Sequence, residues 1–288
     1  GGGAFLAPVA TRMLEKSKNT SAEWKIRQIG KRLKGVEIDP FAAWMTHVLL
    51  ESVLIDLCIK ARKRLPKEVI TVGDALAYES STKFDLVIGN PPYGKVTLDA
   101  TLRDKYARSL FGHANLYGLF TDLALRTAKK DGVIAYLTPT SFLGGQYFKA
   151  LRELLLTEAA PRAFDFISNR EGVFDDVLQE TLLTTFKKGA RRSPSKVSLL
   201  VPQGLNEAKV EHIGKVGIVK GDGPWLIPRV SKDAALLNRI KKMQTRLPDL
   251  GYVVSTGKLV WNRHKTQLKS EKTKDSLPLI WACLLYTS

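Results

Sequence analysis

Short runs of β-branched and apolar residues alternate along the chain with longer segments whose apolar positions recur at helical spacing. This alternation is typical of βαβ units, in which helices connect neighbouring strands of one sheet. The pattern therefore predicts an α/β protein. The expected strands are Leu33–Ile38, Val69–Gly73, Phe84–Ile88, Val133–Thr138, Ala163–Ile167 and Thr181–Phe186, and the expected helices are Phe41–Ala61, Asn115–Lys130 and Leu143–Leu156.

The composition is that of a folded, soluble protein with 288 residues, of which 44% are hydrophobic and 25% are charged. The longest apolar stretch is interrupted by His47, Glu51 and Asp56, so no membrane span or membrane partner is expected. Cys58 and Cys283 are too few for a disulfide framework or a zinc cluster, and no metal is expected. Because no secretory leader opens the chain, a cytoplasmic location is expected.

The positive charge is concentrated toward the C-terminus. Residues through Phe186 contain 25 basic and 21 acidic side chains, whereas those from Lys187 onward contain 20 basic and 7 acidic ones. A Lys/Arg/Gly/Ser/Pro stretch at the transition, residues 187–196, is interpreted as a linker, with a solvated loop as the alternative. The predicted organisation is an α/β domain (1–186), this linker, and a basic domain (197–288) that suits a polyanionic partner.

The strongest chemical signal is the run Asn90-Pro91-Pro92-Tyr93, which follows a predicted buried strand. The two prolines make a stiff turn at the edge of the sheet where α/β proteins place their sites. The Asn90 carboxamide oxygen and the Pro91 carbonyl could accept the two N–H groups of an aromatic amine and hold it toward tetrahedral geometry. Tyr93 could offer a flat face for stacking an extruded base, while the bland alternative is an ordinary Pro-Pro turn.

Two carboxylates follow other predicted strands. Glu37 ends the first strand and can accept both hydroxyls of a ribose, and Asp74 follows the second strand. Each acid alone could equally be a helix cap or a solvated turn residue. A glycine-rich turn, two acids and the Asn90 turn, each beside a strand end, form a more specific combination.

At this point the sequence resembles the N6-adenine DNA methyltransferases of restriction–modification systems, in the TaqI-like group with a C-terminal target-recognition domain. The resemblance covers about two thirds of the chain. It rests on residues 1–6 (GGGAFL), 35–40 (GVEIDP), 73–76 (GDAL), 84–94 (FDLVIGNPPYG), 115–125 (NLYGLFTDLAL), 131–143 (DGVIAYLTPTSFL) and 172–186.

The resemblance implies that residues 1–186 form a catalytic domain with a doubly wound, Rossmann-like methyltransferase sheet and that residues 197–288 form a partial DNA target-recognition domain. It also implies S-adenosylmethionine as cofactor. It implies that double-stranded DNA is the partner, together with a fused or separate restriction endonuclease. The implied cofactor-binding residues are Gly1, Gly3, Phe5, Glu37, Ile38, Asp74 and Ala75, and the implied catalytic, base-holding residues are Asn90, Pro91, Pro92, Tyr93 and Phe174. The segment after residue 250 resembles the start of a recognition region, and its implied DNA-binding residues are Lys258, Trp261, Asn262, Arg263 and Lys265.

Several alternatives remain open from sequence. Related Asn-Pro-Pro-Tyr enzymes methylate RNA or a protein glutamine, and a catalytically dead DNA-binding relic belongs to another class of function. The basic field favours nucleic acid without choosing DNA over RNA. In the segment after residue 250, an exposed basic hairpin is about as good an explanation as a recognition region.

Both ends of the chain also depart from the family pattern. In the family, a strand and an acidic residue precede the glycine turn, and this chain does not contain them before Gly1. At the other end, the last residues, from Trp281, resemble the translation of a sequencing adapter. The expectation is a fragment that lacks the first strand of the sheet.

Overall fold

The computed structural model describes residues 3–79, 81–167, 180–204, 207–221, 223–253, 265–269, 271 and 273–276. Two compact units are present, Gly1–Asn238 and Arg239–Ser288. The first unit contains a mixed sheet of six strands, and all six predicted strands are present in this unit. The α/β, Rossmann-like fold expected from the sequence is confirmed.

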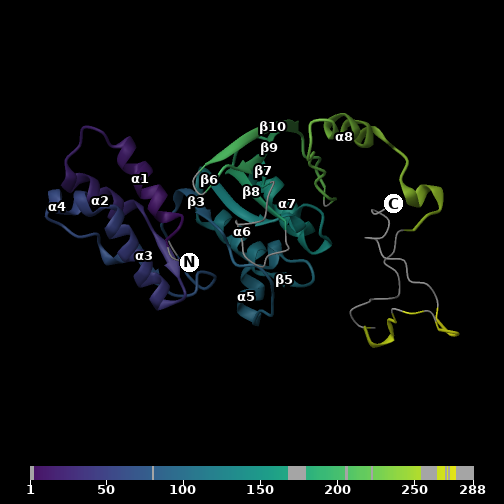
Figure 1. The fold of residues 1–288 in the computed structure, drawn as a ribbon, viewed down its shortest axis with the longest axis horizontal. Coiled ribbons are helices and arrows are strands. Elements are labelled where there is room, and N and C mark those ends of the chain that lie inside the picture. Colours follow the sequence, from purple (N-terminus) through teal and green to yellow (C-terminus); the bar gives the residue numbers. More distant parts are fainter. Residues whose placement is uncertain are drawn as a thin grey trace. The chain divides into compact units, whose positions relative to one another are not determined.

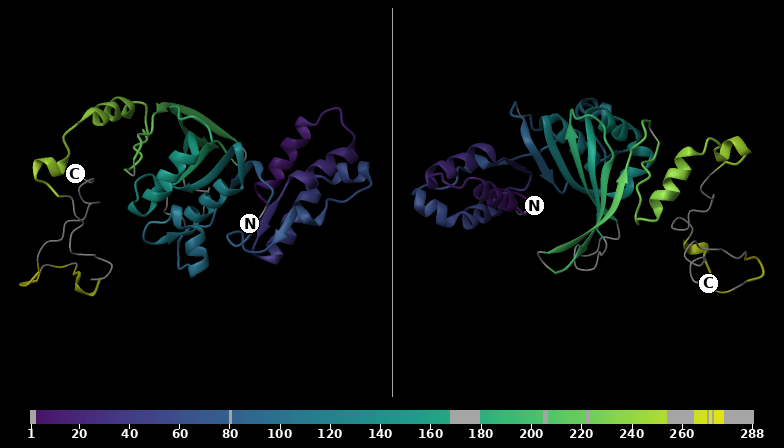
Figure 2. Two further views of the ribbon diagram at one scale, coloured as in Figure 1. Left: turned by 180° about the vertical axis from the view of Figure 1, so that it is seen from behind. Right: turned by 90° about the horizontal axis from the view of Figure 1, so that it is seen from above.

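The central sheet has the order β10-β9-β7-β8-β6-β3 (Figures 1 and 2). The pairs β3–β6 and β7–β9 are parallel, whereas β8 runs antiparallel to both of its neighbours and β10 antiparallel to β9. Burial alternates along β6 from Gly132 to Thr138, as expected for a strand whose two faces differ. The strands are β3 (Phe84–Gly89), β6 (Ala128–Pro139), β7 (Ala159–Ile167), β8 (Thr181–Lys188), β9 (Ser195–Pro202) and β10 (Ala208–Val216).

Helices α6 (Leu116–Thr127) and α7 (Lys149–Glu158) supply the main core of this sheet. Tyr117, Leu125 and Leu151 are almost fully buried in a cluster with side chains of β6, β7 and β8. A smaller cluster forms around Tyr106 and Leu119, where α5 (Ala100–Lys105) and the turn η2 (Ala107–Ser109) meet α6. The short strands β4 (Lys95–Val96) and β5 (Ala114–Asn115) pair antiparallel beside them.

The N-terminal elements form a second sheet with its own core. Strands β1 (Gly35–Glu37) and β2 (Ile70–Val72) are parallel, and within the described residues each is hydrogen-bonded only to the other. Leu33, Leu50 and Val69 are buried among their helices. The single sheet expected from the sequence is therefore present as two sheets, one formed by β1 and β2 and the other containing β3. These elements are α1 (Leu6–Lys16), α2 (Ala22–Arg32), α3 (Pro40–Val53), α4 (Ile55–Ala61) and the turn η1 (Lys67–Val69).

Helix boundaries differ from the prediction at three places. The single helix expected over Phe41–Ala61 is broken at Leu54, where α3 and α4 meet at 71°, and Leu54 turns into the N-terminal core. The helix expected to reach Lys130 ends at Thr127, because the Lys188 ammonium donates to the carbonyls of Leu125 and Ala128 and the chain then enters β6. The helix expected from Leu143 begins at Lys149, after the turns η3 (Thr140–Leu143) and η4 (Gln146–Phe148).

The predicted linker, residues 187–196, does not separate two structural units. Lys187 and Lys188 end β8, and Ser195 and Lys196 begin β9. Strand β9 then pairs in parallel with β7, so the chain beyond the expected boundary completes the central sheet. The basic run is a connection within one sheet, and the compact units divide at Asn238, inside α8 (Asp233–Lys242).

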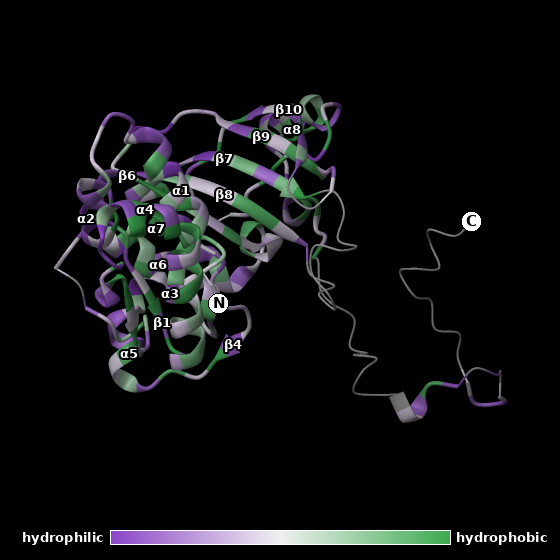
Figure 3. Cartoon of the chain, turned by 60° about the vertical axis from the view of Figure 1, so that its left-hand side comes forward, coloured by the Kyte–Doolittle hydropathy of each residue, from purple (hydrophilic) through white to green (hydrophobic). Residues whose placement is uncertain are grey.

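Helices α3 and α4 expose an unusually apolar surface, and stretches of hydrophobic colour run along α3 in Figure 3. Phe41, Trp44 and Ile59 are 63%, 60% and 66% exposed. Of the helices in the described ranges, none alone has the length and hydropathy to cross a bilayer, and the α3–α4 pair meets those criteria only jointly and across its bend. We call the surface formed by Phe41, Trp44, Met45, Val48, Ile55 and Ile59 the α3–α4 face.

In its described residues, the second unit contains the end of α8 and two short helical turns, η5 (Leu247–Leu250) and η7 (Lys265–Gln267). Gly251 follows η5 at φ 79°, a conformation that glycine adopts without strain. Its amide donates to the carbonyl of Pro248 and closes the turn.

Candidate functional site

The Asn90-Pro91-Pro92-Tyr93 turn lies at the carboxyl end of β3. Strand β3 pairs in parallel with β6 as far as Gly89, which lies opposite Tyr136, and the turn begins at the next residue. Pro91 is buried and anchors the turn, while the side chain of Asn90 is exposed. No hydrogen bond to the Pro91 carbonyl occurs among the described residues. The turn thus places the Asn90 carboxamide oxygen and the Pro91 carbonyl at the end of a strand held by its neighbour, and their role as acceptors for an amine remains a prediction.

Tyr93 is bound back onto this turn. Its hydroxyl donates to Asn90 Oδ1 at 2.7 Å and lies 3.4 Å from the carbonyl of Leu137 on β6. Half-burial of the phenol raises its pKa to about 12, so the hydroxyl is a neutral donor at physiological pH. The sequence predicted the ring as a stacking surface, and the structure adds that its hydroxyl occupies the Asn90 acceptor.

Three residues that sequence reasoning did not single out hold Tyr93 in place. Its ring packs edge-on against Tyr117, with centroids 6.2 Å apart, and Tyr117 stacks on Phe148 at 4.8 Å. The hydroxyls of Tyr117 and Ser141 are 2.8 Å apart. Tyr117 lies in the 115–125 run and Ser141 in the 131–143 run on which the resemblance rests, but neither had an assigned role. Their proximity depends on how α6 packs against η3, which the spacing of residues along the chain does not show.

Asn115 is another polar residue without a role from sequence. It lies on β5 opposite Lys95 of β4, and its side-chain oxygen is buried with no hydrogen-bond partner in the described structure. The next residue, Leu116, donates its amide to the Gly94 carbonyl at 2.9 Å, directly after the turn. Asn115 therefore adds an unused acceptor beside the candidate site.

The two predicted acids end the parallel strands β1 and β2. Glu37 lies opposite Val72, and the Gly73 amide donates to the Glu37 carbonyl at 2.9 Å, which places Asp74 at the same end of this sheet. Glu37 Oε1 accepts from the Asp39 amide, and Asp74 Oδ1 accepts from the Leu76 amide. Both carboxylates thus also order local turns. Ile38, the residue after Glu37, is 69% exposed, and Ala75, the residue after Asp74, is partly buried.

The glycine-rich turn packs against the same N-terminal core. Gly3 is buried at φ 75°, and a Cβ there would lie 3.0 Å from Thr46 of α3, so a side chain would be strained by both conformation and space. The Gly3 carbonyl accepts from the Ala7 amide and leads into α1, with Phe5 partly buried. Gly3, Glu37 and Asp74 therefore belong to one part of the molecule, while Asn90 belongs to the other sheet.

Several predicted site residues lie outside the described residues. They are Gly1, Phe174, Lys258, Trp261, Asn262 and Arg263. Lys265 is described, within the turn η7 of the second unit. The roles assigned to these residues remain predictions.

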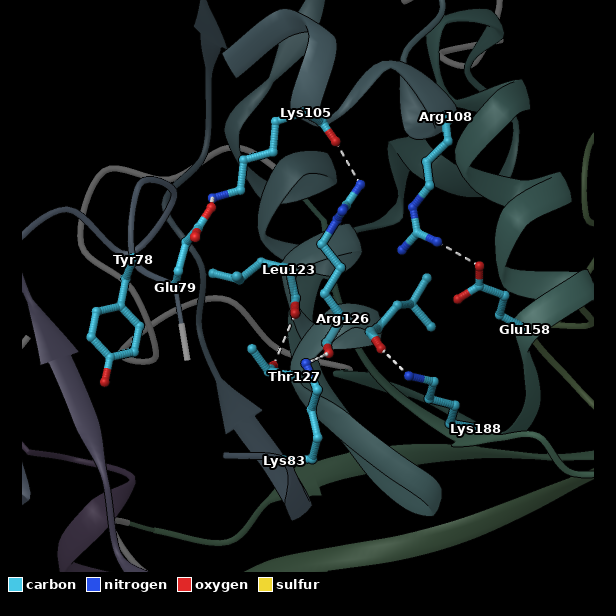
Figure 4. Close-up of a pocket in the computed structure, with 11 residues that line it drawn as sticks. Tyr78, Glu79, Lys83, Lys105, Arg108, Leu123, Arg126, Thr127, Glu158 and Lys188 are labelled. Atoms are coloured by element: carbon cyan, nitrogen blue, oxygen red, sulfur yellow. Dashed lines mark hydrogen bonds and ion pairs between the residues drawn. The ribbon is translucent and has the colours of Figure 1, made fainter. Parts of the chain in front are cut away.

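A hollow of about 390 Å³ lies at the opposite end of the central strands (Figure 4). Lys83, just before β3, and Thr127, just before β6, contribute to its wall. Its basic groups bind within the protein: Arg108 and Arg126 bind the buried Asp122, and Lys83 donates to the Arg126 carbonyl. At this hollow, ion pairs and hydrogen bonds within the protein therefore join α6 to its neighbours, away from the Asn90 turn.

Comparisons with known proteins identify relatives of this chain among Type II methyltransferases. The Type II methyltransferase M.PstI of Providencia stuartii is 30% identical over 218 residues, which are 73% of this chain and 43% of that protein. The Type II methyltransferase M.BsuBI of Bacillus subtilis is 24% identical over 285 residues, which are 96% of this chain and 55% of that protein. The chain thus spans about half the length of these relatives.

Two solved structures share the fold at 16% identity. The ATP-dependent Type ISP restriction-modification enzyme LlaBIII bound to DNA matches 70% of this chain and 17% of its own, with a TM-score of 0.54. A structure describing complex assembly and conformational transition of the type I R-M system matches 86% of this chain and 47% of its own, with a TM-score of 0.55.

The decisive match is to a family model. The model for the Eco57I restriction-modification methylase matches residues 31–174, half of the chain. The matched segment contains Glu37, Asp74 and the complete Asn90–Tyr93 turn. The chain belongs to the Eco57I restriction-modification methylase family.

Proposed function

We propose that this protein transfers a methyl group from S-adenosylmethionine to N6 of an adenine extruded from a specific double-stranded DNA sequence. The observation that carries the proposal is the Asn90–Tyr93 turn, which presents a carboxamide and a free carbonyl at the end of a parallel strand. These acceptors suit an amine attached to a planar ring. Family membership places the reaction in restriction–modification.

In this proposal, the turn binds and orients the target amine. Asn90 Oδ1 and the Pro91 carbonyl accept its two N–H groups, which draws the nitrogen lone pair out of conjugation with the ring. The Tyr93 hydroxyl that now donates to Asn90 Oδ1 gives way to the amine as the base enters. The ring of Tyr93, held by Tyr117, then packs on the base, and Phe174 is proposed to pack on it from another side.

The N-terminal strand ends fit the proposed cofactor. Glu37 can accept from ribose hydroxyls, and the exposed Ile38 beside it can cover an adenine face. Asp74 Oδ1 accepts from Leu76, so its second oxygen is suited to the exocyclic amine of the cofactor, with Ala75 alongside. Gly3, with Gly1 and Phe5, would line the methionine end. S-adenosylmethionine supplies the activated methyl group when bound.

The positive charge suits DNA as substrate. Within the net charge of +17, the part from Lys187 onward contributes most, and Lys258, Trp261, Asn262, Arg263 and Lys265 are proposed to contact DNA there. A fused or separate restriction endonuclease is the proposed partner. A protein that modifies cellular DNA acts in the compartment that contains it, so the expected cytoplasmic location belongs to the same proposal.

Replacing Asn90 tests this function. We expect Asn90→Ala to lower transfer of tritiated methyl groups to unmethylated DNA by at least about 100-fold, because it removes an acceptor used on the target amine. S-adenosylmethionine affinity, measured by calorimetry, should stay within about twofold of the wild type. Gln203→Ala, which removes an exposed amide after β9, is the matched control.

The product separates the proposal from its alternatives. Digested DNA should contain N6-methyladenine, identified by mass spectrometry. Methylation confined to RNA or to a glutamine-containing peptide would overturn the DNA assignment. A loss of cofactor affinity in Asn90→Ala that matches the loss of turnover would overturn the role of Asn90.

A further inference from the structure

Beside the Asn90 turn lies a surface that combines exposed aromatic rings with cations. Tyr147 on η4 is 46% exposed and Phe111 is 37% exposed. The ring centroids of His113 and Tyr147 are 5.3 Å apart, and Lys95 Nζ lies 5.9 Å from the centre of the Tyr147 ring. Lys149 Nζ lies 3.7 Å from the centre of the Phe111 ring. We call Lys95, Phe111, His113, Tyr147 and Lys149 the aromatic platform.

The platform is linked to the base-holding turn through residues adjacent to it in the chain. Lys95 follows Tyr93 by two residues, on the strand that pairs with β5. Tyr147 precedes Phe148, which stacks on Tyr117, and Tyr117 packs against Tyr93. The same packing that positions Tyr93 therefore positions Tyr147.

The local backbone is adapted to present Tyr147. Gly112 has φ 70°, and a Cβ there would lie 3.0 Å from the Tyr147 ring. The absence of a side chain lets the ring lie against the 111–113 loop. Arg103 donates to the Gly112 carbonyl at 3.2 Å and adds a further cation to the loop.

Among the described residues, neither Lys95 and Lys149 of the platform nor the neighbouring Arg103 forms an ion pair. Cations interleaved with flat exposed rings are the combination with which proteins bind strands of nucleic acid, the rings stacking on bases and the cations contacting phosphates. We propose that the aromatic platform holds the DNA strand that flanks the target adenine. This inference rests on the proposed function, because it takes the Asn90 turn as the site of the reacting base.

The test uses the full-length enzyme with unmethylated DNA as the probe, measured by filter binding at several salt concentrations and by methyl-transfer kinetics. We expect Tyr147→Ala to raise the KM for DNA by about 5- to 100-fold, with S-adenosylmethionine affinity unchanged. Tyr147→Phe keeps the ring and should stay within about twofold of the wild type. Tyr78→Ala removes a similarly exposed tyrosine, 40% exposed, at the hollow and serves as control.

A second variant removes the cations. In the double variant Lys95→Gln/Lys149→Gln, the slope of log affinity against log salt should fall by about 2, as expected for two lost phosphate contacts. Lys130→Gln, at the opposite end of β6, should leave the slope unchanged. Because these lysines are at the surface, this variant decides the question if Tyr147→Ala does not fold.

The outcomes separate the platform from the chemistry. Wild-type affinity and salt slope in both variants, with methylation intact, would overturn the platform and leave the proposed function standing. If the wild type binds DNA but does not methylate it, the proposed chemistry is overturned. Weaker DNA binding by the variants would in that case still support the platform. A wild type that does not bind DNA would overturn both.

Discussion

At the residue scale, the hydrogen bond from Tyr93 to Asn90 satisfies the carboxamide before any substrate is present. The Asn90 side chain is exposed, and the tyrosine hydroxyl donates to its oxygen at 2.7 Å, so this acceptor is bonded within the protein. The same hydroxyl must leave when a base binds. Tyr93 is therefore expected to have two separable roles, one through its ring and one through its hydroxyl.

Tyr93→Phe separates these roles. We expect it to retain methyl transfer within about tenfold, because the ring still packs on Tyr117 and Asn90 Oδ1 becomes free for the base. Tyr93→Ala removes both the ring and the hydroxyl and should lose base extrusion, measured as lower 2-aminopurine fluorescence at the target. Equal losses in the two variants would show that the hydroxyl is required.

The raised pKa of Tyr93 gives this prediction a pH dependence. Burial lifts the pKa from 10 to about 12, so the hydroxyl stays protonated in the folded protein up to about pH 11. Its contribution to folding is complete below pH 10 and is lost as pH rises toward 12, because the unfolded chain deprotonates first. Wild type and Tyr93→Phe should therefore have parallel rate profiles from pH 7 to 10.

At the element scale, the position of the Asn90 turn depends on the pairing of β3 with β6. The pairing contains an irregularity between Phe84 and Leu86, opposite the segment where Asp131 adopts φ 65°. Gly132 follows, and a Cβ there would lie 2.9 Å from the Lys129 carbonyl and 3.0 Å from the Phe84 carbonyl. Neither backbone atom can move without disturbing β3.

Gly132→Ala should therefore destabilise the protein and disturb its site together. We expect the free energy of unfolding in urea to fall by about 1–3 kcal/mol, with a loss of methyl transfer at temperatures where the protein stays folded. Gly217→Ala is the matched control, because a Cβ at Gly217 meets nothing within 4 Å. Equal stability of the two variants would contradict the packing described at Gly132.

The elements also show what local sequence determines. All six strands predicted from apolar runs are present, because their side chains enter a core on at least one face. Strand β9 was missed since it follows a basic run, although Val197 is buried within it, and its assignment depends on pairing with β7 more than 30 residues earlier. The break at Leu54 was missed for a similar reason, because the core that draws Leu54 inward is built from distant residues.

The candidate site likewise has a part that local sequence predicts and a part that depends on tertiary packing. Asn90, Pro91 and Tyr93 were predictable because a strand, a stiff turn and an aromatic residue are consecutive in the chain. The support from Tyr117, Ser141 and Phe148 was not, because it is assembled by the packing of α6 against η3 and η4. Contacts made through tertiary packing have no periodic signal in one sequence.

At the scale of the whole molecule, the α3–α4 face is expected to drive self-association. Large exposed apolar patches on soluble proteins are usually covered in the functional state. We expect residues 1–288 produced alone to bind the dye ANS and to form concentration-dependent oligomers in sedimentation experiments. The double variant Trp44→Gln/Ile59→Lys should reduce both effects, whereas Tyr252→Gln, an equally exposed residue elsewhere, should not. A monomeric wild type without ANS binding would contradict this expectation.

The distribution of charge predicts where DNA affinity resides. Residues 233–288 contain 10 basic and 4 acidic side chains, a net charge of +6. A chain ending at Lys232 keeps all strands of the central sheet and should bind DNA with a markedly lower affinity and a smaller salt slope. The unchanged fold can be checked by circular dichroism. An affinity and slope equal to those of the longer chain would place DNA binding on the sheet-bearing unit alone.

The pairing of β9 with β7 also determines how this protein could be recombined with its relatives. A crossover within residues 187–196 would join the first four strands of the central sheet from one parent to the edge hairpin of another, and the parallel register from Ala163 to Ile167 would have to match by chance. A crossover after Val216 leaves every strand with its original partner. Chimeras designed to exchange specificity should therefore inherit β9 and β10 from the same parent as the Asn90 turn, so that the edge hairpin and the turn are transferred as one unit.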